Sequence, residues 1–173
     1  MHLTLFLLVG YPGSGKTTAA RCIRDLTGAE HIWVDRERHV MFGDPTHLPM
    51  ESHTLYDRLN TLTDQLLGEG KSVVFDTSFN LYQDRQNLRD VADKHGARTV
   101  VVWLVTSKEV AEQRAVHDYT LRNDYSYRLQ KVEFDRMSSH LEPPRTDERP
   151  IELDGTNITV ESVALALAVA GVV

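Results

Sequence analysis

The stretch Gly10-Tyr11-Pro12-Gly13-Ser14-Gly15-Lys16-Thr17, GYPGSGKT, decides what kind of chain this is. It matches the pattern G-x-x-x-x-G-K-[ST] at every fixed position and follows the apolar run LTLFLLV at 3–9 directly. An apolar strand, this loop and a following helix point backbone N–H groups and the positive end of a helix at bound phosphates. The stretch therefore predicts a nucleoside triphosphate site, and it leaves open where the phosphate goes.

The residues of this phosphate loop have separate expected roles. Gly10, Gly13 and Gly15 let the backbone turn and approach the anion without a Cβ in the way. Lys16 is expected to reach the β- and γ-phosphate oxygens, and the Thr17 hydroxyl is expected to ligate Mg²⁺. With ATP and Mg²⁺ as cofactors, the expected nucleotide-binding set in this stretch is Gly10, Tyr11, Pro12, Gly13, Ser14, Gly15, Lys16, Thr17 and Thr18.

Size and composition narrow the class of protein. A chain of 173 residues with 41% hydrophobic and 25% charged residues is typical of a single soluble globular domain, here 1–173. The net charge of −6 and the lack of a basic stripe argue against an extended nucleic-acid surface, which needs a broad cationic face. The single cysteine, Cys22, indicates a reducing cytoplasm. No membrane span is expected, and no structural zinc site, since the histidines lack ligand spacing.

Strand and helix patterns alternate along the chain. Apolar, β-branched runs predict strands at 3–9, 31–34, 72–75, 99–105 and 150–153, and their near-continuous apolarity suits a parallel sheet. Helices are predicted at 16–26, 36–42, 52–70, 81–96, 108–118 and 126–142, with a last one within 163–173. Gly70 and Gly96 stand where helices should stop. The order predicts a three-layer α/β fold with about five parallel strands.

The end of the third predicted strand bears on the fate of the phosphate. SVVFDTS ends on Asp76, and many ATPases place a water-activating glutamate beside such an aspartate. Here the neighbour is Thr77, which cannot serve as a base. The guanine-binding tetrapeptide N-K-x-D and the signature LSGGQ are both missing from the sequence. Transfer to an acceptor is therefore favoured over hydrolysis or switching.

An acceptor site needs a base, and Asp35 is the candidate. It follows the predicted strand HIWV, at the end where open α/β sheets hold ligands. Its carboxylate can take the proton of an attacking hydroxyl, and Arg38, one helical turn later, can hold an anionic part of the acceptor. Asp35 can instead be the N-cap of the helix at 36–42. Both interpretations stay open.

The set GYPGSGKTT, WVDRERHVMFGDP, VVFDTSFNLYQDRQNL, VVWLVTSKEVAEQR and LEPPRTDERPIELDG resembles the P-loop kinases grouped around bacteriophage polynucleotide 5′-kinase, with zeta toxins and small-molecule kinases as relatives. The resemblance covers nearly the whole chain. It implies that Asp35 is the catalytic base and that Arg38 contacts a phosphate of the acceptor. It also implies that Asp76 and Thr77 line the acceptor pocket and orient Arg38.

The resemblance further implies an arginine-bearing helical lid, expected around 113–128. Arg114 is the candidate for contact with the nucleotide and Arg122 for catalysis on the transferred phosphate. Alternatively, these arginines belong to a solvated helix face. In the loop DGTN, Thr156 and Asn157 are expected beside the adenine, unless Asn157 caps the last helix.

The acceptor itself is not fixed by the sequence. The segment 42–56 is the least periodic part of the chain, and loops at such a rim carry specificity. One hypothesis is a kinase for a hydroxyl such as a nucleic-acid or nucleotide 5′-OH. A second is a kinase of zeta-toxin type for a sugar, a nucleotide-sugar or an antibiotic. A third is a nucleotide-binding regulatory module with little transfer activity. The sequence does not indicate an oligomeric state.

Overall fold

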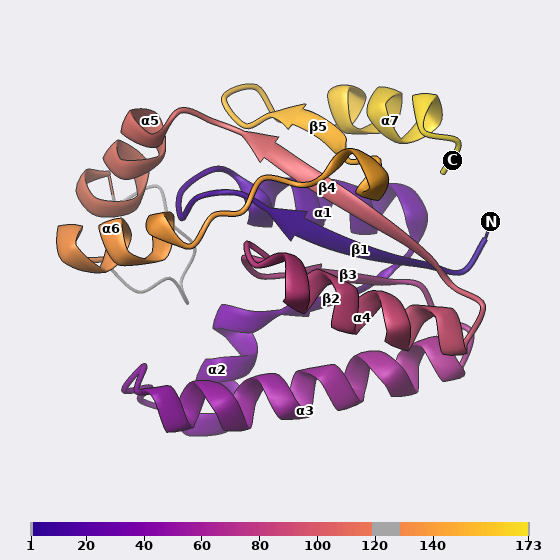
Figure 1. Ribbon diagram of the computed structural model, residues 1–173, viewed down its shortest axis with the longest axis horizontal. Coiled ribbons are helices and arrows are strands. Elements are labelled where there is room, and N and C mark those ends of the chain that lie inside the picture. Colours follow the sequence, from indigo (N-terminus) through magenta and orange to yellow (C-terminus); the bar gives the residue numbers. More distant parts are fainter. Residues whose placement is uncertain (1, 119–128, 173) are drawn as a thin grey trace.

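A parallel sheet forms the centre of the structure, a computed structural model that describes residues 2–118 and 129–172. Within these residues the sheet has five strands in the order β2-β3-β1-β4-β5 (Figure 1). The strands are β1 (Thr4–Val9), β2 (Glu30–Trp33), β3 (Val73–Asp76), β4 (Arg98–Val105) and β5 (Ile151–Asp154). All neighbours pair in parallel, so the expected parallel sheet of about five strands is confirmed.

Helices cover both faces of the sheet, which confirms the expected three layers (Figure 1). Helices α3 (Pro49–Gly68) and α4 (Tyr82–Lys94) lie on one face, and α1 (Lys16–Thr27) and α7 (Val160–Val169) lie on the other. The central strand β1 serves both cores, because successive side chains point to opposite faces. Leu5 and Leu7 join the α3 and α4 side, and Phe6 and Leu8 join the α1 and α7 side.

Smaller elements gather beyond the carboxyl ends of the strands. Helix α5 (Lys108–Glu112) continues into a π-helical turn, η1 (Gln113–His117), and α6 (Lys131–Ser139) packs against both. They form a third cluster around Ala111, Ala115 and Phe134, and Tyr11 of the phosphate loop packs against it. A 3₁₀ turn, η3 (Thr146–Glu148), precedes β5. No helix in the described part of the chain has both the length and the apolar character to cross a bilayer.

The helix ends show which of the expected stop and cap residues take those roles. Gly70 (φ 76°) and Gly96 (φ 64°) both follow helices in the left-handed conformation, as expected. The expected cap Asn157 is wrong, because the N-cap of α7 is Thr159, whose hydroxyl accepts from the Ser162 N–H at 3.1 Å. The capping interpretation of Asp35 is wrong too. Helix α2 (Val34–Phe42) begins early, so Trp33 is its N-cap and Asp35 lies in its first turn.

Part of the segment 42–56 is more regular than expected. Helix α3 starts at Pro49, so only the residues at 43–48 lie between α2 and α3. Proline at the first helical position has the φ that a helix needs and lacks the N–H that would stay unpaired there. The irregular rim is therefore a short loop, followed at once by the first turn of a long helix.

Candidate active site

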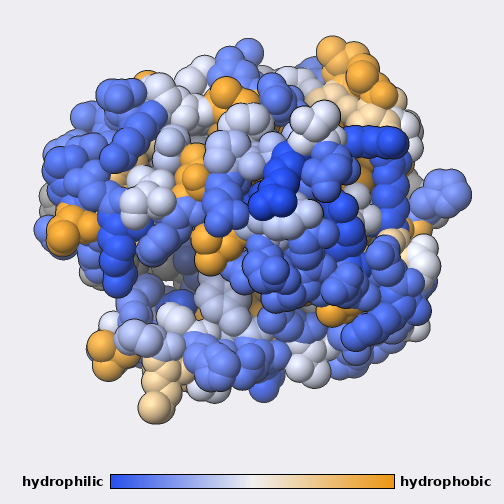
Figure 2. Space-filling view, viewed as in Figure 1, coloured by the Kyte–Doolittle hydropathy of each residue, from blue (hydrophilic) through white to orange (hydrophobic). Residues whose placement is uncertain are grey.

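The candidate residues meet at the carboxyl edge of the sheet. The phosphate loop follows β1, Asp76 is the last residue of β3, and Trp33 at the end of β2 stands opposite Asp76 in register. Asp35 follows two residues after Trp33. Figure 2 shows the surface hollowed on this side, between the part that carries α6 and the part that carries α2 and α3. The fold thus brings together residues from three separate strand ends.

Two positions of the phosphate loop favour glycine, through both their backbone conformation and their close packing. Gly13 has φ 82° and Gly15 has φ 102°, and a Cβ on them would collide with the carbonyl oxygen of Ala111 and the side chain of Ile158, respectively. The Ser14 hydroxyl oxygen is buried and has no hydrogen-bond partner among the described residues. A tight cradle with an unpartnered polar atom inside it fits a bound phosphate chain. Pro12 is buried, and Thr18 is exposed in the first turn of α1.

Lys16 and Asn80 brace the loop from two sides. The Lys16 ammonium donates to the carbonyl oxygens of Gly10 at 3.0 Å and Tyr11 at 2.7 Å. The Gly10 N–H donates to Oδ1 of the buried Asn80 at 3.1 Å. Sequence reasoning missed Asn80, although its position soon after the end of β3 is a signal for this edge of the sheet.

Thr17 and Asp76 lie side by side. The Thr17 hydroxyl donates to Asp76 Oδ1 at 3.3 Å, and His31 Nε2 lies 3.2 Å from Asp76 Oδ2. Hydroxyl and carboxylate oxygens are ligands that Mg²⁺ prefers, and it takes only one or two of them beside phosphate and water. Within residues 2–118 and 129–172, no group of three or more His, Cys, Asp or Glu side chains is placed to hold a metal. His31 was not expected here.

Arg38 is held by the start of α3. It is 7% exposed, and its guanidinium donates to Glu51 Oε1 at 2.6 Å and to Ser52 Oγ at 3.2 Å. Asp76, expected to orient this arginine, instead contacts Thr17 and His31. In the structure, Glu51 therefore has the orienting role. Sequence reasoning missed it because it lies in the segment without visible periodicity.

Glu51 also closes the loop between α2 and α3. Its carboxylate accepts from the N–H of Thr46 at 2.7 Å, the hydroxyl of Thr46 at 2.8 Å and the N–H of His47 at 3.2 Å. Burial works to raise the pKa of Glu51, but the hydrogen bonds from Arg38, Thr46 and His47 outweigh it and lower that pKa to about 2. The carboxylate is thus firmly ionised.

The residues expected to bind the acceptor lie around Tyr56. Its hydroxyl lies 2.8 Å from Oγ1 of Thr77. Burial raises the pKa of the Tyr56 phenol. The hydrogen bond with Thr77 and the charge of Arg38 lower that pKa, and the charge of Asp35 raises it further. The structure thus places Arg38, Tyr56 and Thr77 around the start of α3, and Asp35, in the first turn of α2, acts on the same phenol through its charge, as does Asp84.

Arg114 joins the candidate lid to the loop after β5. From η1 its guanidinium donates to the carbonyl oxygen of Gly155 at 2.7 Å. Gly155 in turn is packed against the Ser14 carbonyl and the Thr106 hydroxyl without room for a side chain. Hydrogen bonds from Thr156, and then the charge of Arg114, lower the pKa of Asp154. Arg114 thus lies beside the phosphate loop, whereas Arg122 and the rest of 119–128 lie outside the described residues.

The fold and this edge together define a P-loop protein of kinase type, a class that uses ATP with Mg²⁺. The chain belongs to the family described as AAA domain, whose model matches residues 5–144. No curated protein matches it.

Solved structures of similar fold come from several kinases. One is a gluconokinase from Sinorhizobium meliloti, with a TM-score of 0.66, 21% identity, and coverage of 96% of this chain and 90% of that one. Another is the APS kinase CysC of Mycobacterium tuberculosis in complex with AMPPNP and APS, with a TM-score of 0.65, 17% identity, and coverage of 99% and 97%. A protein of Chloroflexus aurantiacus, provisionally named a kinase, has a TM-score of 0.75 at 18% identity over 100% of both chains. At such identities the likeness shows the fold.

Proposed function

We propose that the protein is an ATP-dependent kinase that transfers the γ-phosphoryl group to a hydroxyl of a small acceptor. The observation that carries the proposal is the arrangement at one sheet edge. The braced phosphate loop and the Thr17–Asp76 pair stand beside the neighbourhood of Asp35, Arg38, Tyr56 and Thr77. One side offers a place for a nucleotide and the other a place for an alcohol and its base.

In the proposed reaction the loop N–H groups and Lys16 hold the triphosphate, and Thr17 and Asp76 hold Mg²⁺. The ion, when bound, neutralises charge on the β- and γ-phosphate oxygens. Asp35 takes the proton of the acceptor hydroxyl while the hydroxyl oxygen forms a bond to the γ-phosphorus. The bond from that phosphorus to the bridging oxygen breaks, and ADP leaves. Arg114, and Arg122 from the lid, are proposed to balance the charge on the transferred group.

The engagement of Arg38 supports a choice of acceptor class. Its guanidinium is nearly buried and already paired with Glu51, so an acceptor phosphate would have to displace a carboxylate. The neighbouring hydroxyls of Tyr56 and Thr77 suit uncharged hydroxyl groups. We therefore favour a small polyhydroxy compound over a nucleotide 5′-OH bearing a phosphate. The gluconokinase shows that this fold can serve a small acceptor.

The test is a transfer screen with γ-labelled ATP over sugars, polyols, nucleosides, nucleotide-sugars and 5′-OH oligonucleotides. We expect label on a sugar or polyol. Asp35→Asn should slow transfer by about 10²–10⁴-fold with ATP affinity retained, because only the base is lost. Asp93→Asn, an exposed carboxylate near the end of α4, is the matched control and should not change the rate.

Each other outcome overturns a defined part of the proposal. Label on oligonucleotide ends alone would reject the small acceptor. A wild-type rate for Asp35→Asn would remove Asp35 as the base. Tight ATP binding without transfer to any acceptor would favour the regulatory module.

A further inference from the structure

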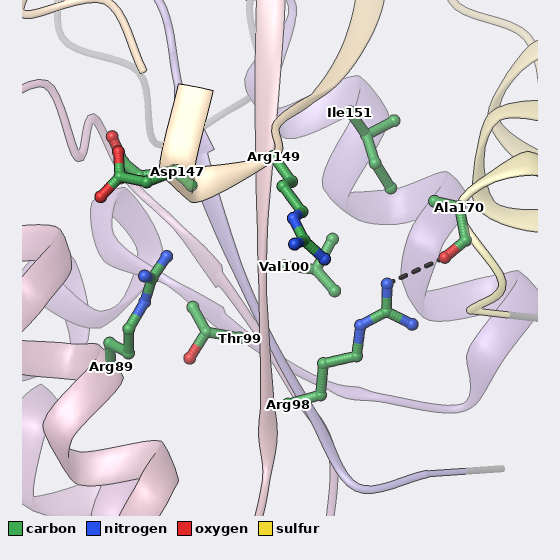
Figure 3. A pocket seen from close by; sticks show the side chains of 9 residues that line it. Arg89, Arg98, Thr99, Val100, Asp147, Arg149, Ile151 and Ala170 are labelled. Carbon is green, nitrogen blue, oxygen red and sulfur yellow. Dashed lines mark hydrogen bonds between the residues drawn. The ribbon is translucent and has the colours of Figure 1, made fainter. Parts of the chain in front are cut away.

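A second pocket lies at the opposite edge of the sheet, far from the phosphate loop. It has a volume of about 270 Å³ and is drawn in Figure 3. It forms where β5 begins later than β4, because the pairing of these strands starts at Val102 and Ile151. Residues 98–100 of β4 therefore have no β5 residue beside them. The volume is near the lower end of ligand pockets, roughly 300 Å³, and suits a small molecule.

Three arginines from three elements line this pocket, which stands out in a chain of net charge −6. In Figure 3, Arg89 of α4 lies on one side of β4, and Arg98 and Arg149 lie on the other. Arg98 is fixed by donating to the carbonyl oxygens at the end of α7, Gly171 at 2.9 Å and Ala170 at 2.8 Å. The side chains of Arg89 and Arg149 make no hydrogen bond or ion pair within 2–118 and 129–172. The guanidinium groups of Arg89 and Arg149 are thus available to bind an anion.

The acidic residues of the pocket do not cancel this charge. Glu148 is fully buried and takes two hydrogen bonds from Arg85, at 2.7 and 2.9 Å. Asp147 remains, and Figure 3 shows its carboxylate directed away from Arg149. The charge of Arg89 also acts on Glu148 and helps to lower its pKa, but with Arg85 included four guanidinium groups stand against the two carboxylates of Asp147 and Glu148.

Two backbone and side-chain features at the uncovered edge point to a missing partner. The Thr99 hydroxyl oxygen is buried and has no hydrogen-bond partner among the described residues. The Arg98 N–H donates to Leu3 on the β1 side at 2.8 Å, so in a parallel strand the Thr99 N–H faces the uncovered edge. Arg149 has φ 46° where it caps the 3₁₀ turn η3, a left-handed conformation that is strained for a non-glycine residue.

We propose that this pocket binds a small phosphate-bearing anion, at a site separate from the nucleotide site. Planar guanidinium forks suit the oxygens of a phosphate group; Arg89 would approach the anion from one side of β4, and Arg149 and the fixed Arg98 would approach it from the other. The hydroxyl and N–H of Thr99 supply further donors at the strand edge. The anion would thereby satisfy groups that have no partner in the protein itself.

The test is a calorimetric titration of inorganic phosphate into the protein saturated with Mg²⁺ and AMPPNP, so that the phosphate loop is blocked. The same titration in Lys16→Ala protein makes the result independent of the proposed kinase activity. Arg89→Gln and Arg149→Gly should each weaken phosphate binding by about tenfold or more, the loss expected for one charged hydrogen bond. Arg58→Gln, an exposed arginine on α3, is the matched control and should bind like the wild type.

Arg149→Gly keeps the left-handed backbone, so its melting temperature should not fall and lost binding will not reflect unfolding. The proposal is overturned if phosphate gives no more heat than chloride at matched ionic strength. It is overturned equally if Arg89→Gln and Arg149→Gly bind phosphate as the wild type does.

Discussion

At the residue scale, Gly13 shows how little freedom the phosphate loop has. Its left-handed backbone and the nearby Ala111 carbonyl exclude a Cβ for two separate reasons. We expect Gly13→Ala to weaken nucleotide binding by about tenfold or more, because the loop must shift away from the phosphates. Calorimetry with AMPPNP and Mg²⁺ measures this.

Gly28→Ala separates the two reasons. Gly28 ends α1 with φ 71°, but a Cβ there would meet nothing within 4 Å. The substitution should therefore cost only the backbone strain, about 1–2 kcal/mol of unfolding free energy, and leave nucleotide affinity intact. If Gly13→Ala behaves in the same way in both assays, the close approach to Ala111 is not what requires glycine.

Glu51 makes a pH-dependent contribution to stability. Its folded-state pKa of about 2 is below the ordinary value of 4.5. The folded state therefore favours the ionised form, and the stabilisation is fully present above about pH 4.5 and is lost as the pH falls towards 2. Glu51→Gln should lower the melting temperature at pH 7, and its difference from the wild type should shrink below about pH 4.5.

The measurement is thermal unfolding of both proteins from about pH 7 down to pH 3. Glu109→Gln, an exposed glutamate in the first turn of α5, serves as control and should show a much smaller difference. A difference for Glu51→Gln that stays constant across the range would contradict the assigned ion pair and hydrogen bonds.

At the scale of elements, the strands were the most predictable part. All five expected strand runs hold a strand, because strands buried on both faces of a parallel sheet are apolar almost throughout. The starts of helices were less predictable. Val34 belongs by composition to the run HIWV, yet it begins α2, and α3 begins at Pro49, three residues before its predicted start. Packing against neighbours decides such boundaries, and a local pattern does not contain it.

The cap of α7 gives a direct comparison of two neighbouring residues. Thr159→Ala should lower the unfolding free energy by about 1 kcal/mol, because its hydroxyl satisfies the Ser162 N–H. Asn157→Ala should change it little. Urea unfolding of the two variants checks this, and an equal loss for both would show that the cap is not confined to Thr159.

The candidate site likewise has a part that the sequence predicted and a part that it did not. The phosphate loop was predictable because all its fixed positions lie in one short stretch. Glu51, His31 and Asn80 were not, since each acts through a partner that only the fold brings near: Arg38, Asp76 and Gly10. Residue type distinguished none of the three, and only the position of Asn80 soon after β3 pointed to the site. Long-range pairing, rather than residue type, makes them part of the site.

At the scale of the whole molecule, nucleotide binding should stabilise the fold as a unit. A ligand that binds only the folded state at about 100 times its dissociation constant adds about 2.7 kcal/mol to the unfolding free energy. We therefore expect Mg²⁺ and AMPPNP to raise the melting temperature of the wild type clearly. Lys16→Ala should lose most of that rise, because the ammonium braces the loop and meets the phosphates. An equal rise in both proteins would place the nucleotide elsewhere.

The loop after β5 forms one wall of the nucleotide site, together with the phosphate loop that follows β1. Gly155 is packed on Ser14 and Ile158 on Gly15, so the two walls of the nucleotide cradle come from opposite ends of the described chain. Contacts between such distant residues raise the contact order of the fold, which slows refolding. A refolding molecule can consequently hold ATP only once the loop after β5 has joined the phosphate loop.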